Sequence, residues 1–96
     1  MRPSEALENN RNLIRSTVTR YRGGNARVFG SVLSGNDTDA SDLDILIDPT
    51  PEMTFFDIGA IRHELMTHLG VSVDVLTPQS LPTEIRTSII REARPI

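Results

Sequence analysis

The sequence contains no cysteine, no lysine and no tryptophan, and each absence narrows what the protein can be. Without cysteine, disulfide bridges and thiolate metal sites are excluded, so any bound metal must be held by oxygen or imidazole ligands. Aromatic residues make up only 4% of the chain, so aliphatic side chains must fill the core. All 10 basic residues are arginine, a residue that suits carboxylate and phosphate recognition. The base composition of the gene is the simpler explanation of a lysine-free chain.

Long hydrophobic runs and an excess of positive charge are missing too. No apolar stretch approaches the roughly 18 residues that a membrane span requires, and residues 1–10 lack the apolar centre of a signal peptide. We therefore expect a cytoplasmic protein with no membrane contact. The net charge of −3, from 13 acidic and 10 basic residues, disfavours direct binding to nucleic acid. The 96 residues, of which 38% are hydrophobic, predict one folded domain over residues 1–96.

Hydrophobic periodicity predicts that helices and strands alternate along the chain. The first helix is expected to begin after Ser4 as N-cap and to end at the Gly23-Gly24-Asn25 stretch, and a later helix is expected to end at Gly70. The order α-β-(α)-β-α-β-α predicts an α/β (α+β) fold with a small mixed three-stranded sheet flanked by helices. The predicted helices cover residues 4–22, 54–69 and a segment between Pro82 and Pro95, and the predicted strands cover residues 26–29, 42–48 and 71–76.

A glycine-serine pair directly follows the first predicted strand. Gly30 and Ser31 begin a Gly-Ser-x-x-x-Gly pattern that Gly35 completes. Glycine lets the backbone approach a phosphate closely, and the N–H groups that open a short helix form an anion site. The Ser31 hydroxyl adds a further donor. Taken alone, however, a Gly-Ser pair after a strand is more often only a turn.

Three aspartates lie on predicted strands. Asp42 and Asp44 are two residues apart, so on a strand they share one face at a spacing of roughly 6–7 Å and can hold a hard cation such as Mg²⁺ together. An Asp-x-Asp pair is equally typical of the solvent-facing side of an edge strand. Asp74 stands among valines, where an ionised side chain costs free energy unless it is paired or bound to metal. Asp74 meets the other two if the strands are neighbours, and faces solvent on a half-exposed strand if they are not.

The acidic run from Asp37 also suggests a calcium-binding loop. The sixth position of such a loop is glycine and the twelfth is glutamate, whereas this chain has Asp42 and Asp48 there. We therefore expect Asp37 and Asp39 to lie in a solvated loop.

Two pairs on the helix predicted over residues 54–69 have simple interpretations. His63 and His68 are five residues apart and do not form the HExxH pattern of zinc proteases, so they are expected on the surface. Phe55 and Phe56, with Met53, are expected to pack at the start of the helix.

Taken together, Gly30-Ser31, a gap of ten residues, Asp42-Leu43-Asp44 and the later Asp74 resemble the signature of the DNA polymerase β-like nucleotidyltransferase superfamily. The length, the order of elements and the tail over residues 91–96 are similar to its minimal nucleotidyltransferase (MNT) branch. Members of that branch are commonly antitoxins paired with HEPN-domain ribonuclease toxins.

The resemblance implies a role for each motif residue. Asp42 and Asp44 would bind two Mg²⁺ ions, and Asp74 would complete the metal site and help to deprotonate the attacking hydroxyl. Gly30 and Ser31 would hold the triphosphate of ATP. The implied reaction transfers AMP to a hydroxyl, in the antitoxin branch a tyrosine of the HEPN-type toxin, and thereby neutralises the toxin.

The chain departs from the family pattern at one place. Many members have an Arg-Ala-Arg-Gly stretch after Gly-Ser, whereas this chain has Val32, Leu33 and Ser34 before Gly35. An arginine from elsewhere could substitute, and the candidates are Arg27, Arg62 and Arg86. The departure leaves open an antitoxin that is catalytically weak or inactive and neutralises its partner by binding only. A transferase acting on RNA ends or a small molecule is a third interpretation, and it would need an acceptor site from a partner.

Overall fold

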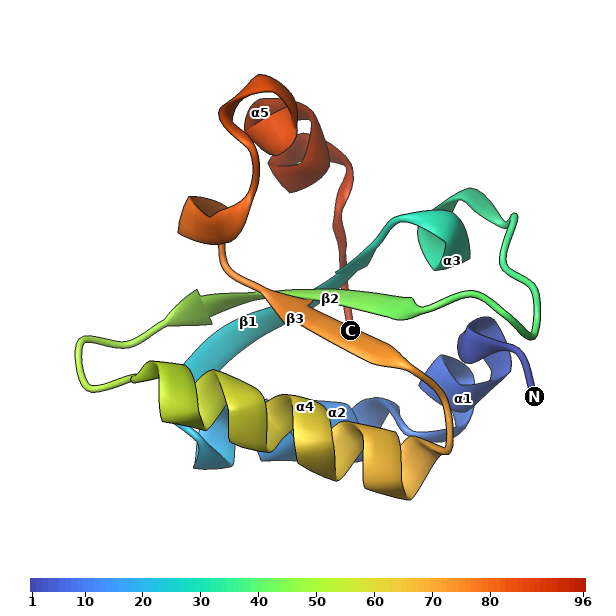
Figure 1. The fold of residues 1–96 in the computed structure, drawn as a ribbon, viewed down its shortest axis with the longest axis horizontal. Helices are drawn as coiled ribbons and strands as arrows, with labels where there is room; N and C mark the ends of the chain where they lie inside the picture. Colours follow the sequence, from blue (N-terminus) through green and yellow to red (C-terminus); the bar gives the residue numbers. More distant parts are fainter.

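The computed structural model describes all of residues 1–96, and it confirms the mixed α/β class (Figure 1). No helix combines the length and hydropathy that crossing a bilayer requires. In chain order the elements are α1 (Pro3–Asn9), α2 (Arg11–Arg20), β1 (Gly23–Phe29), α3 (Ser31–Ser34), β2 (Leu43–Pro49), α4 (Phe55–Leu69), β3 (Val73–Leu76), the 3-10 helix η1 (Pro78–Ser80), α5 (Thr83–Glu92) and β4 (Arg94–Pro95).

The sheet has four strands in the order β3-β2-β1-β4, one more than the sequence predicted. β1 runs antiparallel to both β2 and β4, while β2 and β3 are parallel. The fourth strand is only Arg94–Pro95, at the sheet edge, where a proline is tolerated because its nitrogen need not donate. The Ile96 backbone N–H donates to the Ala26 carbonyl at 2.9 Å, and the buried Ile96 side chain fixes the tail to the core.

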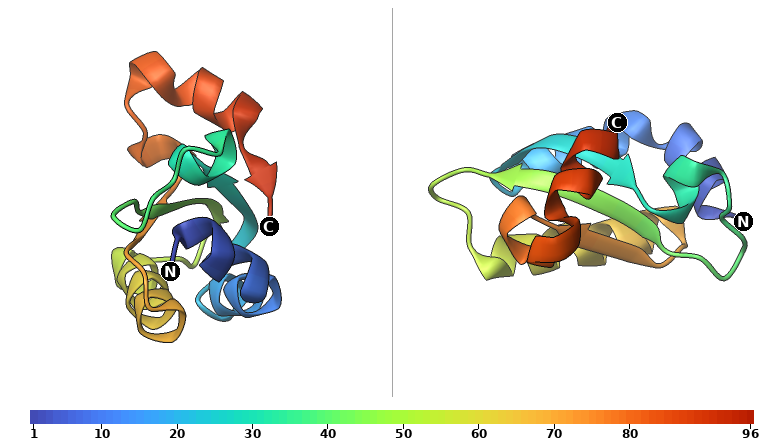
Figure 2. Two further views of the ribbon diagram at one scale, coloured as in Figure 1. Left: turned by 90° about the vertical axis from the view of Figure 1, so that its right-hand side faces the viewer. Right: turned by 90° about the horizontal axis from the view of Figure 1, so that it is seen from above.

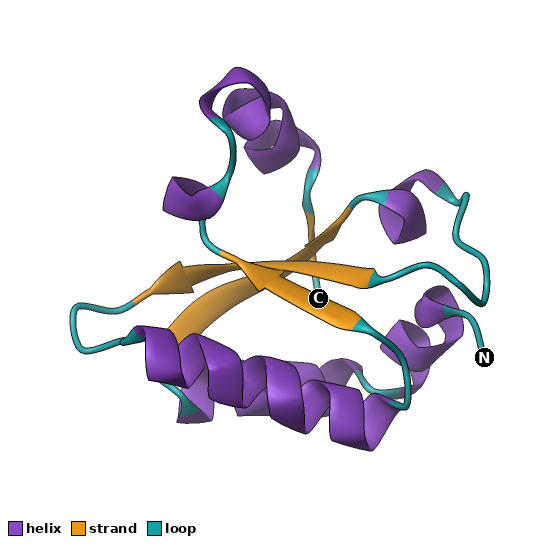
Figure 3. Ribbon diagram, viewed as in Figure 1, coloured by secondary structure: helices purple, strands orange, loops and turns teal.

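The two faces of the sheet are covered differently. α2 and α4 lie under one face, and α5 stands over the other (Figures 2 and 3). The alternation of β2 decides which residues go where, because successive side chains of a strand point to opposite faces. Leu43, Ile45 and Ile47 are fully buried in the main core with α2 and α4. Leu46 faces the other way and is also buried, in a small cluster with Phe29 and Leu81 under α5.

The N-terminal segment differs from the prediction of one helix over residues 4–22. It forms two helices that meet at Asn10, whose side-chain amide donates to the Ala6 carbonyl at 2.9 Å. The Ser4 N-cap prediction was wrong, because α1 already begins at Pro3, a residue well suited to the first turn.

The two glycines expected to end the first helix lie instead inside β1. The helix ends at Arg20, and the chain turns at Arg22, which has positive φ. Asn25, also with positive φ, lies within β1 where its pairing with β2 is irregular. Gly23 is needed for a different reason: a Cβ there would lie 2.9 Å from Cγ1 of Val18. The strand therefore passes so close to α2 that only glycine fits.

α4 begins and ends as its sequence indicates. The Thr54 hydroxyl accepts from the Asp57 backbone N–H at 3.4 Å, and the Asp57 carboxylate accepts from the Thr54 N–H at 2.9 Å. Gly70 closes the helix in the left-handed conformation, φ 71°, as predicted. His63 and His68 are exposed, which confirms the surface prediction.

Two predictions about single residues were wrong. Phe55 and Phe56 do not pack at the start of α4: their side chains are 91% and 90% exposed. Asp37 is not solvated but buried, and its carboxylate accepts from the Ser4 backbone N–H at 3.0 Å. Hydrogen bonds from Ser4 hold the pKa of Asp37 below its usual range. Asp37 thus caps α1, a role that the local sequence could not show because the two residues are far apart in the chain.

The exposure of the two phenylalanines predicts how stability responds to their removal. Phe55→Ala with Phe56→Ala should change the free energy of unfolding by less than about 0.5 kcal/mol, because neither side chain packs in the core and its removal leaves no cavity. Leu65→Ala is the matched control: Leu65 is fully buried in the same helix and its truncation should cost about 2–5 kcal/mol. Urea unfolding of the three proteins measures both effects, and a large loss in the phenylalanine variant would contradict the exposed placement.

Candidate active site

The site lies where β1 ends against the beginning of β2. β1 stops at Phe29, Gly30 follows with φ 76°, and the single-turn helix α3 starts at Ser31. A Cβ on Gly30 would lie 2.2 Å from Oδ2 of Asp44. Glycine is therefore required here twice, for the positive φ and for the close approach of the turn to this carboxylate. The structure brings the Gly30-Ser31 turn and Asp44 together, as the sequence pattern predicted.

Asp44 is the centre of the arrangement. In the sheet it pairs with Phe29 of β1 on one side and with Asp74 of β3 on the other. Its side chain is half-buried. Loss of solvation, together with the smaller effects of the negative charges of Asp74 and then Asp42, raises the pKa of Asp44 to about 6. No arginine or histidine forms an ion pair with any of the three carboxylates, although the chain has six ion pairs elsewhere.

Asp74 stands directly beside Asp44 because β2 and β3 are parallel neighbours in register. Of the two arrangements that the sequence left open, the structure therefore has the one in which these strands are neighbours. The Asp74 side chain is exposed, on the same face as Asp44, while its flanking valines are buried on the other face. The strand begins at Val73 rather than at Val71, so Asp74 lies near its start.

Asp42 lies just outside the strand, which begins at Leu43 and not at Asp42 as expected. The preceding residues form a turn in which the Thr38 backbone N–H donates to the Ser41 hydroxyl at 2.9 Å. Asp42 is exposed, yet its charge contributes to the raised pKa of Asp44. In this arrangement no three acidic or histidine side chains already form a group that could hold a metal ion.

The chemistry of the donor set fits a hard divalent cation. All three side chains offer oxygen, the ligand type that Mg²⁺ prefers, and one or two carboxylates are its usual protein ligands. The half-buried Asp44 faces like charges and has no cationic partner. A divalent ion would remove that repulsion and return the pKa of Asp44 toward its ordinary range.

None of the three arginines considered as substitutes for the missing loop arginines is free to act at the turn. Arg27 is buried and bonded to Asp48 at 2.5 Å. Nε of Arg62 donates to the Val73 carbonyl at 3.0 Å. Arg86 donates to backbone carbonyls next to its own helix. The loop itself offers no cation, because α3 consists of serine, valine and leucine residues. Val32 and Leu33 pack partly against the core.

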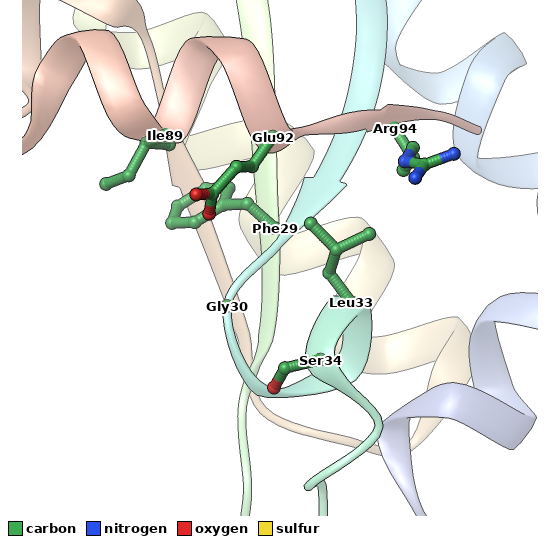
Figure 4. Close-up of a pocket in the computed structure, with 7 residues that line it drawn as sticks. All are labelled: Phe29, Gly30, Leu33, Ser34, Ile89, Glu92 and Arg94. Atoms are coloured by element: carbon green, nitrogen blue, oxygen red, sulfur yellow. The ribbon is translucent and has the colours of Figure 1, made fainter.

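Behind the turn lies a hollow of about 610 Å³, bounded by α3, α5 and β4 (Figure 4). Two of its lining residues, Glu92 and Arg94, lie in the tail over residues 91–96, for which the sequence predicted no role in the site. They belong to the end of α5 and to β4, and only the return of the C-terminal tail to β1 brings them here. No local motif marks them, so sequence reasoning had no signal for their position.

Comparisons with known proteins agree with this geometry. Residues 13–96 match the family model described as "Polymerase beta, Nucleotidyltransferase". The chain belongs to the polymerase β nucleotidyltransferase family. Over 68 residues the domain is 34% identical to "Putative protein adenylyltransferase MJ0435" of Methanocaldococcus jannaschii, which covers 71% of this chain and 73% of that protein.

Two solved structures share the fold of this nucleotidyltransferase domain. One, described as "Structure of putative minimal nucleotidyltransferase", has a TM-score of 0.86 and 33% identity over 97% of this chain and 95% of that one. The second, "Crystal structure of the toxin-antitoxin with AMP-PNP", has a TM-score of 0.75 at 19% identity and covers 90% of this chain and 71% of that one. The first likeness places the domain in the minimal nucleotidyltransferase type; the second supports the fold alone.

The contact between Gly30 and Asp44 predicts the effect of one added methyl group. Gly30→Ala should lower the free energy of unfolding by about 1–3 kcal/mol, because the turn has positive φ and the methyl meets the carboxylate. Gly59→Ala is the control, since nothing lies within 4 Å of a Cβ there and alanine favours the helix. Thermal unfolding distinguishes them; equal effects would mean that the turn does not press against Asp44.

The raised pKa of Asp44 predicts a pH-dependent gain in stability from Asp44→Asn. The folded-state pKa of about 6 lies above the ordinary value of 3.8. Ionisation of Asp44 is therefore penalised in the folded state, and the wild type loses stability as the pH rises through 6. At pH 7–8 the asparagine variant should be more stable by about 1 kcal/mol, after allowance for partial solvent exposure.

The pH series supplies its own check, because the advantage of Asp44→Asn should shrink as the pH falls to 4. Asp48→Asn is the control on the same strand and face: it breaks the ion pair with the buried Arg27 and should destabilise the domain. Chemical unfolding at pH 4, 6 and 8 measures these differences. A loss of stability in Asp44→Asn at pH 8 would contradict the assignment of an unneutralised carboxylate.

Proposed function

We propose that the domain transfers AMP from ATP to a hydroxyl of a HEPN-type toxin, namely a tyrosine hydroxyl, and that this modification neutralises the toxin. The observation that carries the proposal is the half-buried Asp44 carboxylate, which lies between the Gly30 turn and Asp74 without a cationic partner. Carboxylates that lie close together without a cationic partner reduce stability, and such groups are typical of functional sites that bind a cation. A nucleoside triphosphate with Mg²⁺ fits the donor set and the adjacent turn.

The proposed site has a metal-binding part and a phosphate-binding part. Asp42 and Asp44 would hold two Mg²⁺ ions, and Asp74 would complete this metal site. Magnesium held there would supply positive charge to the triphosphate and to the attacking and leaving oxygens. The Gly30 and Ser31 backbone N–H groups and the Ser31 hydroxyl hold the phosphates.

In the proposed reaction the acceptor hydroxyl oxygen forms a bond to the α-phosphorus of ATP. The bond from that phosphorus to the oxygen bridging the α- and β-phosphates breaks, and pyrophosphate leaves with that electron pair. The hydroxyl proton passes to the carboxylate of Asp74, which is exposed and can release it to water. The protein mainly positions the reactants, as is usual in phosphoryl transfer.

The acceptor hydroxyl is assigned to a partner protein because the single tyrosine of the domain lies away from the proposed site. Tyr21 is the single tyrosine, and its hydroxyl donates to Oε1 of Glu64 at 2.6 Å. That hydrogen bond raises the pKa of Tyr21. Tyr21 and Glu64 lie at α2 and α4, on the sheet face opposite the aspartates. The relative at 34% identity is described as a "Putative protein adenylyltransferase", which supports a protein as the acceptor. The structurally similar complex with AMP-PNP is a toxin-antitoxin, which supports a toxin as that protein.

Transfer is tested by incubating the domain with its co-expressed toxin, Mg²⁺ and ATP labelled at the α-phosphorus. The wild type should label the toxin, and Asp44→Asn should lower the rate at least about 100-fold, because the proposed site loses a metal ligand. Asp48→Asn, a change of the same kind on the same strand face, should retain most of the rate. Absence of label from an intact wild-type complex would refute transfer.

A second candidate function is neutralisation by binding alone. It is favoured by the loop after Gly30-Ser31, where Val32, Leu33 and Ser34 stand before Gly35 and no side chain of the loop carries a positive charge. This function predicts that Asp42→Ala with Asp44→Ala still protects cells from the toxin, whereas AMP transfer predicts loss of protection. Growth after toxin induction, with complex formation checked by co-purification, decides between them.

A further inference from the structure

The hollow behind the Gly30 turn has a size and a position that the phosphate and metal site do not explain. Its volume of about 610 Å³ is within the range of small-molecule sites. Gly30 borders both features: it lines the hollow, and it lies against the Asp44 carboxylate. A nucleotide whose phosphates lie at this turn is therefore within reach of the hollow.

The walls of the hollow suit a flat aromatic ring. Phe29 from the end of β1, Leu33 from α3 and Ile89 from α5 line the hollow from three separate elements. Leu33 and Ile89 are half-buried and offer most of the apolar surface, whereas the Phe29 ring is largely buried. Figure 4 shows Ile89 and Glu92 reaching down from α5 to the Phe29 ring, with Leu33 on the other side of the gap. Stacking of a base on aromatic and aliphatic side chains contributes binding energy for any base.

Charge indicates which part of the nucleotide enters. Glu92 lines the hollow and forms no ion pair or hydrogen bond with another residue, so its carboxylate is available to a ligand. A carboxylate only accepts hydrogen bonds and repels phosphate. It therefore disfavours the triphosphate here and favours a group with N–H donors. Arg94 lies at the far side of the hollow, beyond Leu33.

The strand order excludes the acceptor from the hollow. The hollow lies on the side of β1 and β4, whereas Asp74 lies on β3 at the opposite edge of the sheet. An acceptor hydroxyl that gives its proton to Asp74 approaches from that opposite edge. The hollow is thus left to the nucleoside.

We propose that this hollow binds the nucleobase, and that the Glu92 carboxylate selects a base with an exocyclic amino group. The inference rests on the proposed function and deepens it, because it assigns base preference to residues outside the aspartate motif. Glu92 acts here as a specificity-determining residue. ATP and inosine triphosphate are the matched probes, since the two purines have nearly the same size. Adenine has an amino donor on C6 beside an N1 acceptor, whereas hypoxanthine has an oxygen acceptor on C6 beside an N1–H donor, so a carboxylate that selects the exocyclic amino group favours ATP.

The experiment is calorimetric titration of the full chain, with Mg²⁺ present, by ATP, inosine triphosphate and inorganic tripolyphosphate. Wild type should bind ATP about tenfold more tightly than inosine triphosphate, in line with a hydrogen bond to a charged group. Glu92→Ala should weaken ATP binding about tenfold and abolish the preference, while tripolyphosphate binding is unchanged or tighter. Glu84→Ala, an exposed change on the same helix, is the control and should change nothing.

A second variant tests the hollow itself. Ile89→Trp fills part of the space and should weaken ATP binding about tenfold or more without affecting tripolyphosphate. Wild-type ATP affinity in both Glu92→Ala and Ile89→Trp would overturn the inference while leaving the proposed function standing. An equal loss of ATP and inosine triphosphate in Glu92→Ala would overturn selection by the amino group. No binding of ATP by the wild type would overturn the inference together with the function.

Discussion

The parallel pairing of β2 with β3 is the constraint on which the site depends. Its register puts Asp44 and Asp74 side by side on one face while Ile45 and Val75 fill the core on the other. The alternation of a strand makes these two outcomes inseparable, because a shift by one residue would bury the carboxylates and expose the core. The hydrophobic core therefore enforces the closeness of the acidic groups, against their mutual repulsion.

This arrangement stores an electrostatic cost at one position. Asp44 is half-buried and faces two carboxylates, whereas Asp48 on the same strand face is bonded to Arg27. The contrast shows that an aspartate on β2 can be neutralised by an arginine of the neighbouring strand, as Arg27 neutralises Asp48. At Asp44 no cationic side chain does so, an arrangement typical of functional sites.

α5 and the C-terminal tail form two walls of the hollow behind the Gly30 turn. The tail returns to β1 through Arg94 and the buried Ile96, so the end of α5 stays above Phe29. The hollow thus depends on a two-residue edge strand. In a domain of this size, one short strand both completes the sheet and forms a wall of the proposed base site.

Local sequence determined the elements and the motif of this protein. The alternation over residues 43–48, the helix ending at Gly70 and the order of Gly30-Ser31, Asp42-Leu43-Asp44 and Asp74 were readable because they are short-range patterns of backbone and side-chain chemistry. The tertiary structure decided what depends on distant partners. It made Asp37 a cap for α1, left Phe55 and Phe56 exposed, bound Arg27 to Asp48, and brought Glu92 to the hollow that Gly30 also lines. Each of these results from packing between segments far apart in the chain, which no local pattern encodes.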